Sequence, residues 1–307
     1  MLRDRSGVTQ VFLNPALSKE FGTLPKESVV SIEGEVKKRP PHQVKKEMST
    51  GEIEVSATRI TVISTSETPL PIEMTEDTTT NIDKRIDYRF LDVRRRKISA
   101  IFNVRSKVYA LTTQFFITEG FVNINTPKLT QSGVESGAEE FKIDYFGKKA
   151  SLAQSPQIYK QMFVVSGLEK VFEIGPIFRA EKSHTTRHLT EFIGIDFEMG
   201  FITDEHDVMD VIEKYFKFLI EGINKECVEE LSILGVSLMV PQKIPRLDMP
   251  EIKKLLKERG KVIPEHEDLD AEAEKLLGEI VEEKYGSNFV FTLGYPWTKR
   301  PFYHMRP

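Results

Sequence analysis

The fold is decided by residues 171–198, which read VFEIGPIFRAEKSHTTRHLTEFIGIDFE. Apolar residues at alternate positions of 171–179 predict a strand, and residues 190–201 predict a second strand across a polar turn. The alternation places Arg179 on one face of the first strand, and Glu181 points the same way. We therefore expect a two-stranded hairpin with charged side chains where its first strand ends.

These charged side chains have the chemistry to hold a nucleotide. A planar guanidinium such as that of Arg179 suits an α-phosphate, and Glu181 can hold the guanidinium or an amine. Arg187 and His188 can meet more distal phosphates. The chain has no GxxxxGK[ST] loop and no GxGxxG after a strand, so side chains would have to grip the phosphates. A charged hairpin on a surface sheet also fits the same residues.

The rest of this region predicts helices and strands without a regular βαβ order. Apolar residues recur at three- and four-residue steps over 97–119, and Gly120 ends this helix. Further predicted elements are helices that begin at Ser155 and Thr203, helices over 248–260 and 270–285, and a strand over 288–294. Such a mixture indicates an α+β fold, built on an antiparallel sheet with flanking helices.

The amino-terminal part of the chain predicts a separate β domain. Its three predicted strands, rich in Val, Ile and Thr, are 8–13, 28–36 and 53–63. Residues 65–81 contain two prolines and few helix formers, which predicts an extended linker. We expect one domain over 1–64, this linker, and a second domain over 82–307.

The amino-acid composition excludes a membrane-spanning protein. The 307 residues are 39% hydrophobic and 29% charged, without the run of about 18 apolar residues that crosses a membrane. The chain starts without an apolar leader, and its only cysteine, Cys227, has no partner for a disulfide, so we expect a cytoplasmic protein. The net charge of −4 does not indicate a nucleic-acid binder, but basic runs within 37–46 and 84–97 can neutralise phosphates locally. Solvated charged faces would explain these runs equally well.

Residues 154–161 read QSPQIYKQ and place polar side chains near the start of a predicted helix. Gln157 and Lys160 are three residues apart and share one helical face, close to a helix N-terminus that favours an anion. A lysine charge aimed into a pocket selects a carboxylate side chain over its amide. Lys160 also fits an exposed position on an amphipathic helix.

Two groups of segments resemble the class II aminoacyl-tRNA synthetases. FRAE at 178–181, TTRHLTEF at 185–192 and IDFE at 195–198 resemble motif 2 of this class. GFVNINTPKL at 120–129, which includes Pro127, resembles motif 1, the helix, strand and proline that build the dimer interface of the class.

Further segments resemble the archaeal-type aspartyl enzymes within this class. QSPQIYKQ is similar to their SPQ-x-[YF]-KQ element, whereas asparaginyl relatives usually have an apolar residue in place of Lys160. SGVESGAEEF at 132–141 resembles the loop that closes over aspartate, with Glu135 near the α-amino group. Residues 1–64 resemble the OB-type barrel that reads the anticodon. The tracts RFLDVR at 89–94 and RPFYHM at 300–305 also match.

The resemblance implies an aspartate–tRNA ligase reaction. Such an enzyme joins L-aspartate to ATP as aspartyl-adenylate, with Mg²⁺, and transfers aspartate to tRNA(Asp), with tRNA(Asn) as an open second acceptor. Arg179 is the implied catalytic residue. The implied aspartate-binding residues are Glu135, Gln157, Lys160 and Arg179, and the implied ATP-binding residues are Arg179, Glu181, Arg187, His188 and Phe192. A homodimer with Pro127 at its interface completes the expectation.

The family pattern also has parts without a counterpart in this chain. No glycine-rich motif 3 with its arginine occurs before Pro307, and the metal ligands are expected in that segment, so the metal site is unknown. The first residues resemble the middle of the barrel. We therefore expect a partial OB-type barrel and a chain truncated at both ends, which does not aminoacylate tRNA by itself.

Three other interpretations remain open. An asparagine synthetase derived from this family would share the aspartate and ATP residues but would lack the anticodon-binding barrel. A non-catalytic RNA-binding paralogue would tolerate loss of motif 3, yet it would not need Arg179, Glu181, Gln157 and Lys160 together. The third interpretation is a nucleotide-binding protein outside the family.

Overall fold

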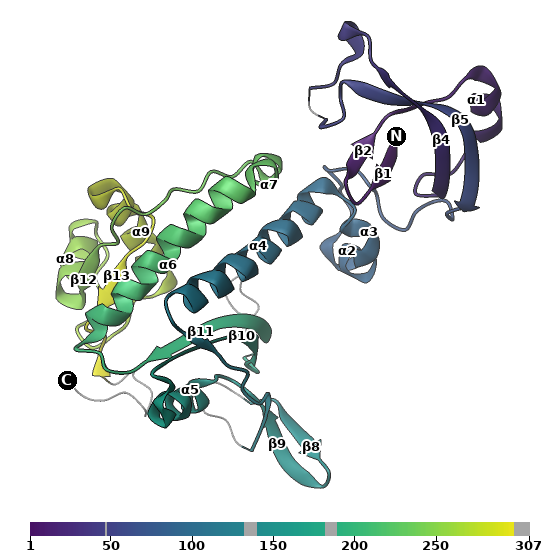
Figure 1. Cartoon of the computed structure of the whole chain (residues 1–307). Helices are drawn as coiled ribbons and strands as arrows, with labels where there is room; N and C mark the ends of the chain where they lie inside the picture. The colour runs from purple at the N-terminus through teal and green to yellow at the C-terminus, as the bar shows by residue number, and fades with distance from the viewer. Residues whose placement is uncertain (47, 132–139, 182–188, 298–307) are drawn as a thin grey trace. The chain divides into compact units, whose positions relative to one another are not determined.

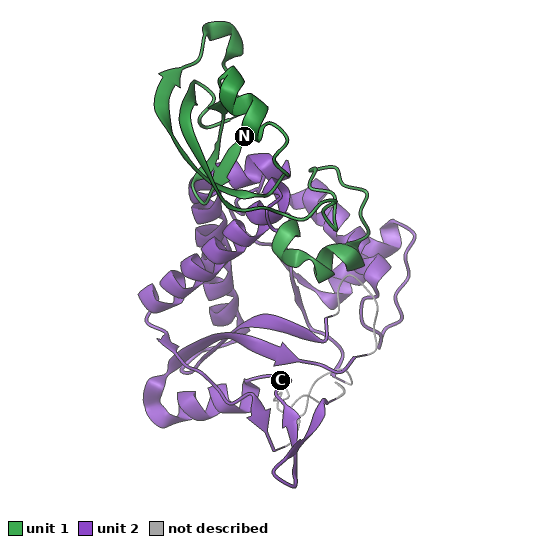
Figure 2. Ribbon diagram, turned by 90° about the vertical axis from the view of Figure 1, so that its right-hand side faces the viewer, with its two compact units in different colours: residues 1–92 green, residues 93–307 purple. Residues whose placement is uncertain are grey.

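The protein forms two compact units, residues 1–92 and 93–307 (Figure 1, Figure 2). The computed structural model describes residues 1–46, 48–131, 140–181 and 189–297. The stretch 65–81, predicted as an extended linker, contains no helix or strand. Among the described residues, no helix is both long and apolar enough to span a membrane.

The largest sheet of the first unit has the strand order β3-β5-β4. Strands β4 (Val29–Lys38) and β5 (Ile53–Ser64) run antiparallel, with irregularities in their register, and β3 (Val11–Phe12) is parallel to β5. Strands β1 (Leu2–Asp4) and β2 (Gly7–Thr9) form a separate hairpin. The described strands form no closed barrel, in agreement with the predicted partial OB-type barrel.

The predicted strand over 8–13 is divided in the structure. Gln10 separates β2 from β3, and its carbonyl accepts a hydrogen bond from the N–H of Val55 (2.9 Å). Helix α1 (Pro15–Phe21) follows and was not predicted. Its signal was Asn14 before a proline, because the Asn14 side chain caps the helix and proline suits the first helical position.

Two short helices, α2 (Ile82–Asp87) and α3 (Arg89–Asp92), end the first unit. The Asp92 carboxylate is fully buried and accepts hydrogen bonds from Arg85 Nε (2.9 Å) and Arg89 Nη1 (2.7 Å). Removing one partner of a buried ion pair is strongly destabilising, so these arginines fix the turn between the helices. Part of the basic run over 84–97 is therefore structural.

The second unit is centred on a sheet with the order β11-β10-β6. Strands β10 (Lys170–Phe178) and β11 (Glu191–Met199) pair antiparallel along their whole length, and β6 (Val122–Asn123) lies parallel to β10. Both strands predicted from the deciding stretch are confirmed to within two residues.

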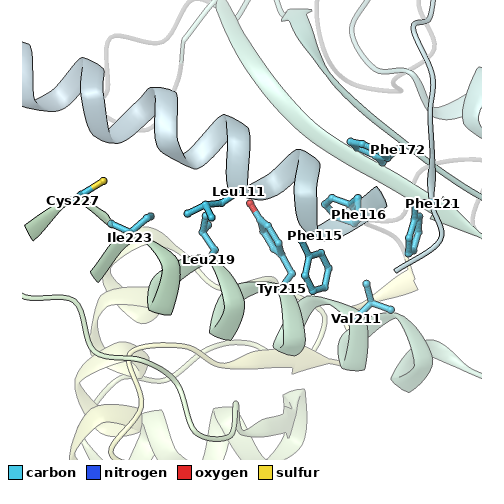
Figure 3. Packing of buried hydrophobic residues seen from close by; sticks show 10 residues of the cluster. All are labelled: Leu111, Phe115, Phe116, Phe121, Phe172, Val211, Tyr215, Leu219, Ile223 and Cys227. Carbon is cyan, nitrogen blue, oxygen red and sulfur yellow. The ribbon is translucent and has the colours of Figure 1, made fainter. Parts of the chain in front are cut away.

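Helices α4 (Arg96–Thr118) and α6 (Glu205–Glu226) pack together on one face of this sheet and enclose an aromatic core (Figure 3). Phe116 is 1% exposed and stacks on Phe172 of β10, with ring centroids 5.0 Å apart. The ring of Tyr215 from α6 lies 5.4 Å from the same Phe116 ring. The core therefore joins both helices to the central strand.

One buried polar pair lies within this core. The hydroxyl oxygens of Thr112 and Tyr215 are 2.7 Å apart, and both residues are buried. Burial raises the pKa of Tyr215, while the hydrogen bond with Thr112 opposes that rise. The phenol is therefore neutral and hydrogen-bonded, so it places no charge in the core.

The second unit contains further elements besides this sheet and its two helices. They are β7 (Leu129–Thr130), β8 (Lys142–Tyr145), β9 (Lys148–Leu152), α5 (Gln157–Phe163), the π-helix η2 (Val164–Leu168), α7 (Val228–Leu234), β12 (Arg246–Asp248), α8 (Met249–Glu258), α9 (Ala271–Tyr285) and β13 (Phe291–Leu293). Strand β9 pairs with both β7 and β8. Residues of β12, α8 and α9 form a second core.

Helices α4, α8 and α9 lie where the sequence predicts them, but α5 and α6 begin two residues late. Helix α5 begins at Gln157, and the N–H of Gln157 donates to the hydroxyl of Ser155 (3.1 Å), which lies outside the helix. Helix α6 begins at Glu205 rather than Thr203, because the side chain of Asp204 provides the cap. These shifts keep Gln157 in the first turn of α5.

Candidate active site

The hairpin of β10 and β11 has one apolar and one polar face. Phe172 and Phe197 are paired across the two strands and lie in the aromatic core with the helices. Glu173 and Asp196 form the neighbouring pair, and successive strand residues point to opposite faces. These two carboxylates therefore lie on the face turned away from α4 and α6.

Lys160 of α5 lies buried against this polar face. Its side chain is 5% exposed, and Nζ forms an ion pair with Asp196 and lies 3.4 Å from Oε2 of Glu198. Nζ also donates to the carbonyl oxygen of Phe197 (3.2 Å), and Gln157 Nε2 donates to Glu198 (3.2 Å). An exposed position for Lys160 is therefore wrong, and the structure brings Gln157 and Lys160 together at one cluster.

Asp196 and Glu198 were not predicted as site residues. Their signal was the pair of acidic residues at alternate positions in an otherwise apolar strand, 195–198. Two carboxylates around one lysine leave a local excess of negative charge. Such an excess attracts a cationic group, for example the ammonium of an amino acid.

Arg179 continues the ladder one residue past β10, because its N–H donates to the carbonyl of Thr190 (2.9 Å). Its guanidinium carbon lies 5.8 Å from the ring centroid of Phe192, a contact that orients the guanidinium plane. Its Nε is buried and donates to no atom of the described part of the chain. A buried donor without an acceptor is unfavourable, and an anion such as a phosphate would satisfy it.

Of the other predicted aspartate- and ATP-binding residues, the structure describes only Glu181. Glu181 is half-buried just beyond Arg179. Glu135, Arg187 and His188 lie outside the described residues. The structure therefore brings together Gln157 with Lys160, and Arg179 with Phe192.

Pro127 is exposed and flanked by a buried polar network. The N–H and Oγ1 of Thr126 donate to the Glu173 carboxylate (3.0 and 2.7 Å), and Lys128 Nζ lies 2.8 Å from the same carboxylate. Glu173 is 3% exposed, and a buried carboxylate requires hydrogen-bond and charge partners of this kind. The segment that carries Pro127 is thereby anchored to β10 while Pro127 faces solvent.

The described residues do not fit a metal site. Within them, no three His, Cys, Asp or Glu side chains are placed to hold a metal ion. The carboxylates of the polar face are instead paired with Lys128 and Lys160. No catalytic step through a metal ion follows from these residues.

Two family models match the chain. The model for tRNA synthetases of class II (D, K and N) matches residues 81–307, and the model for the OB-fold nucleic acid binding domain matches residues 1–63. The fold and the site thus define a class II tRNA synthetase domain that follows an OB-fold domain.

Two of the most similar curated relatives are aspartate–tRNA ligases, one family within this class. The aspartate–tRNA(Asp/Asn) ligase of Aeropyrum pernix is 41% identical over 100% of this chain and 69% of its own length. The aspartate–tRNA(Asp) ligase of Pyrococcus abyssi is 41% identical over 99% of this chain and 69% of its own length. The chain belongs to the aspartate–tRNA ligase family of class II synthetases. These matches do not favour the three alternative interpretations.

Solved structures of related enzymes share the fold. Asparaginyl-tRNA synthetase from Pyrococcus horikoshii, complexed with asparaginyl-adenylate, has a TM-score of 0.87 at 29% identity and covers 100% of this chain and 69% of its own. Aspartyl-tRNA synthetase from Entamoeba histolytica has a TM-score of 0.85 at 30% identity, with coverage of 99% and 66%.

Proposed function

We propose that this chain supplies the aspartate and α-phosphate contacts of an enzyme that activates L-aspartate with ATP and transfers it from aspartyl-adenylate to the 3′ end of tRNA(Asp), with tRNA(Asn) as a second acceptor to be tested. The observation that carries the proposal is Lys160, buried beside Asp196 and Glu198 on the polar face of the hairpin. The Lys160 ammonium suits the side-chain carboxylate of aspartate, while the excess negative charge of Asp196 and Glu198 suits the α-ammonium of the same substrate.

In the activation step, an oxygen of the substrate α-carboxylate attacks the α-phosphorus of ATP. A new P–O bond forms while the bond from this phosphorus to the oxygen bridging to the β-phosphate breaks, and pyrophosphate leaves. Arg179 pairs with the α-phosphate and the substrate carboxylate, which holds the two reacting groups together. Phe192 stacks near the adenine, and Glu181, Arg187 and His188 order the nucleotide. No protein nucleophile takes part.

Recognition of aspartate is assigned to the groups around Lys160. Its ammonium pairs with the side-chain carboxylate of the substrate, Gln157 also binds aspartate, and Glu135 approaches the α-amino group. Asparagine presents a neutral amide, which forms a weaker contact with a buried ammonium. Class II synthetases in general use ATP with Mg²⁺, and no described residue is assigned to the metal ion.

The other assignments follow the family pattern. Residues 1–64 bind the anticodon, 65–81 link the domains, and 82–307 carry catalysis. Basic residues within 37–46 are suited to phosphates of the anticodon loop, since OB-type domains combine a basic groove with stacking. A homodimer, as the resemblance implies, completes the proposal, and the single cysteine fits a reducing cytoplasm.

The amino-acid preference is tested with non-hydrolysable analogues of aspartyl-adenylate and asparaginyl-adenylate. In calorimetric titration of the 307-residue chain, the aspartyl analogue should bind at least about tenfold more tightly than the asparaginyl analogue. This difference is the effect of one charge-assisted contact. An adenylate analogue without any amino acid serves as the control for the nucleotide part. Equal affinity for both aminoacyl analogues would remove the aspartate assignment.

For assembly, we expect Pro127→Arg to yield monomers. An isologous interface uses the same surface of both subunits, so the substitution places two charged side chains in the interface, one from each copy. Sedimentation velocity at micromolar concentration measures the change, with Pro127→Ala as the control that retains the dimer. A wild-type protein that sediments as a monomer would contradict the interface.

A further inference from the structure

The hairpin of β8 and β9 carries two exposed aromatic side chains at its tip. Phe146 is 90% exposed and Tyr145 is 46% exposed, and their ring centroids lie 4.8 Å apart at an interplanar angle of 72°. Both overall views show the hairpin extending away from the central sheet of the second unit (Figure 1, Figure 2). Large apolar rings held in water on a projecting element point to a partner that covers them.

The backbone at the tip does not explain why a phenylalanine stands there. Phe146 has a φ of 51° and Gly147 a φ of 77°. Two successive positive φ values are typical of a type I′ hairpin turn, in which Asn, Asp or Gly is favoured at the first position. Phe146 is therefore unfavourable for the turn, and hairpin stability does not explain the ring at this position.

The charge around the tip is positive. The exposed basic residues of the hairpin are Lys142, Lys148 and Lys149, and none forms an ion pair within the described part of the chain. Asp144 is the acidic residue between them, and it accepts the N–H of Gly147 (3.1 Å). Exposed rings among lysines fit single-stranded nucleic acid, whose bases stack on the rings while its phosphates pair with the ammonium groups.

The base of the hairpin adjoins the candidate active site. The N–H of Phe178, the residue before Arg179, donates to the carbonyl of Ala153 (3.0 Å) just after β9. The chain then continues into α5, which carries Lys160. The four residues of β8 extend about 13 Å. A single strand that runs along the hairpin would therefore reach the site within a few nucleotides.

We propose that the Tyr145–Phe146 tip is a stacking platform for the unpaired 3′ end of the tRNA, with the hairpin lysines pairing with its phosphates. The inference rests on the proposed function, because that function brings this end of the tRNA to the site beside the hairpin. A second copy of the chain is a poorer match, since its own hairpin carries the same positive charge.

The test uses Phe146→Asn, which removes the ring and creates the Asn-Gly pair that a type I′ turn favours. The variant hairpin is therefore expected to fold at least as well as the wild type. Binding of a fluorescent tRNA(Asp) transcript to the 307-residue chain, at fixed salt, should weaken about five- to a hundredfold, the effect of losing one stacked base. Phe146→Trp keeps a ring for stacking and should bind as the wild type does.

A transcript without its unpaired 3′ nucleotides locates the contact. It should bind the wild type and Phe146→Asn with equal affinity. Three results would overturn the proposal. Phe146→Asn could lose the same affinity for intact and trimmed transcripts, it could bind the intact transcript as the wild type does, or the wild type could bind no tRNA. A change in sedimentation of Phe146→Asn without RNA would assign the tip to a second copy instead.

The adenylate analogues separate this inference from the proposed function. If the chain prefers the aspartyl analogue and Phe146→Asn binds the intact tRNA as the wild type does, the proposed stacking platform is wrong while the proposed function stands. If the chain binds both aminoacyl analogues equally but the ring effect on tRNA is present, the aspartate assignment fails and the platform stands.

Discussion

Arg179→Ala is expected to weaken binding of the aspartyl-adenylate analogue by at least about a hundredfold. In a form of the enzyme that carries out aspartate-dependent pyrophosphate exchange, the same substitution should abolish that exchange. One guanidinium is proposed to hold both the α-phosphate and the substrate carboxylate, so its removal deletes two charge-assisted contacts. Its buried Nε has no acceptor within the described residues, which leaves that donor for a ligand. Calorimetric titration of the analogue measures the loss.

A matched control separates charge from geometry. Arg179→Lys keeps the positive charge but loses the planar fork over Phe192, so we expect only partial recovery of affinity. The free energy of unfolding should be no lower than that of the wild type, because Arg179→Ala removes a buried donor without a partner. Near-normal affinity of Arg179→Ala for the analogue would remove Arg179 from its proposed role.

Lys160→Met is expected to have the second largest effect. The affinity for the aspartyl analogue should fall about tenfold to a few hundredfold, because the substrate carboxylate loses its charged partner in a partly desolvated site. ATP binding should stay unchanged. The variant should also be less stable to denaturant by about 1–3 kcal/mol, since Asp196 and Glu198 lose the ammonium between them.

The double variant Lys160→Met with Asp196→Asn distinguishes these two effects. It removes one of the stranded negative charges, so stability should recover in part, whereas affinity for the aspartyl analogue should not. If ATP and the aspartyl analogue weaken equally in Lys160→Met, the lysine is structural and the aspartate assignment loses its main support.

Local signals predicted the long elements of the second unit well. Strands β10 and β11 and helices α4, α8 and α9 lie close to their predicted bounds, because each repeats a periodic pattern over nine residues or more. Strands β6 and β7 contain two residues each, and so short a segment has no period to detect. Their places are set by pairing with β10 and β9.

The amino-acid sequence alone was sufficient to predict the family, the hairpin at 171–198 and the shared helical face of Gln157 and Lys160, because motifs and helical spacing are local properties. Only the tertiary structure decided what Lys160 contacts. Its carboxylate partner Asp196 is 36 residues away in the chain, and the packing of α5 on β11 brings the two together. The same holds for the orphan Nε of Arg179 and for the exposed ring of Phe146, since burial and exposure depend on distant segments that no local pattern encodes.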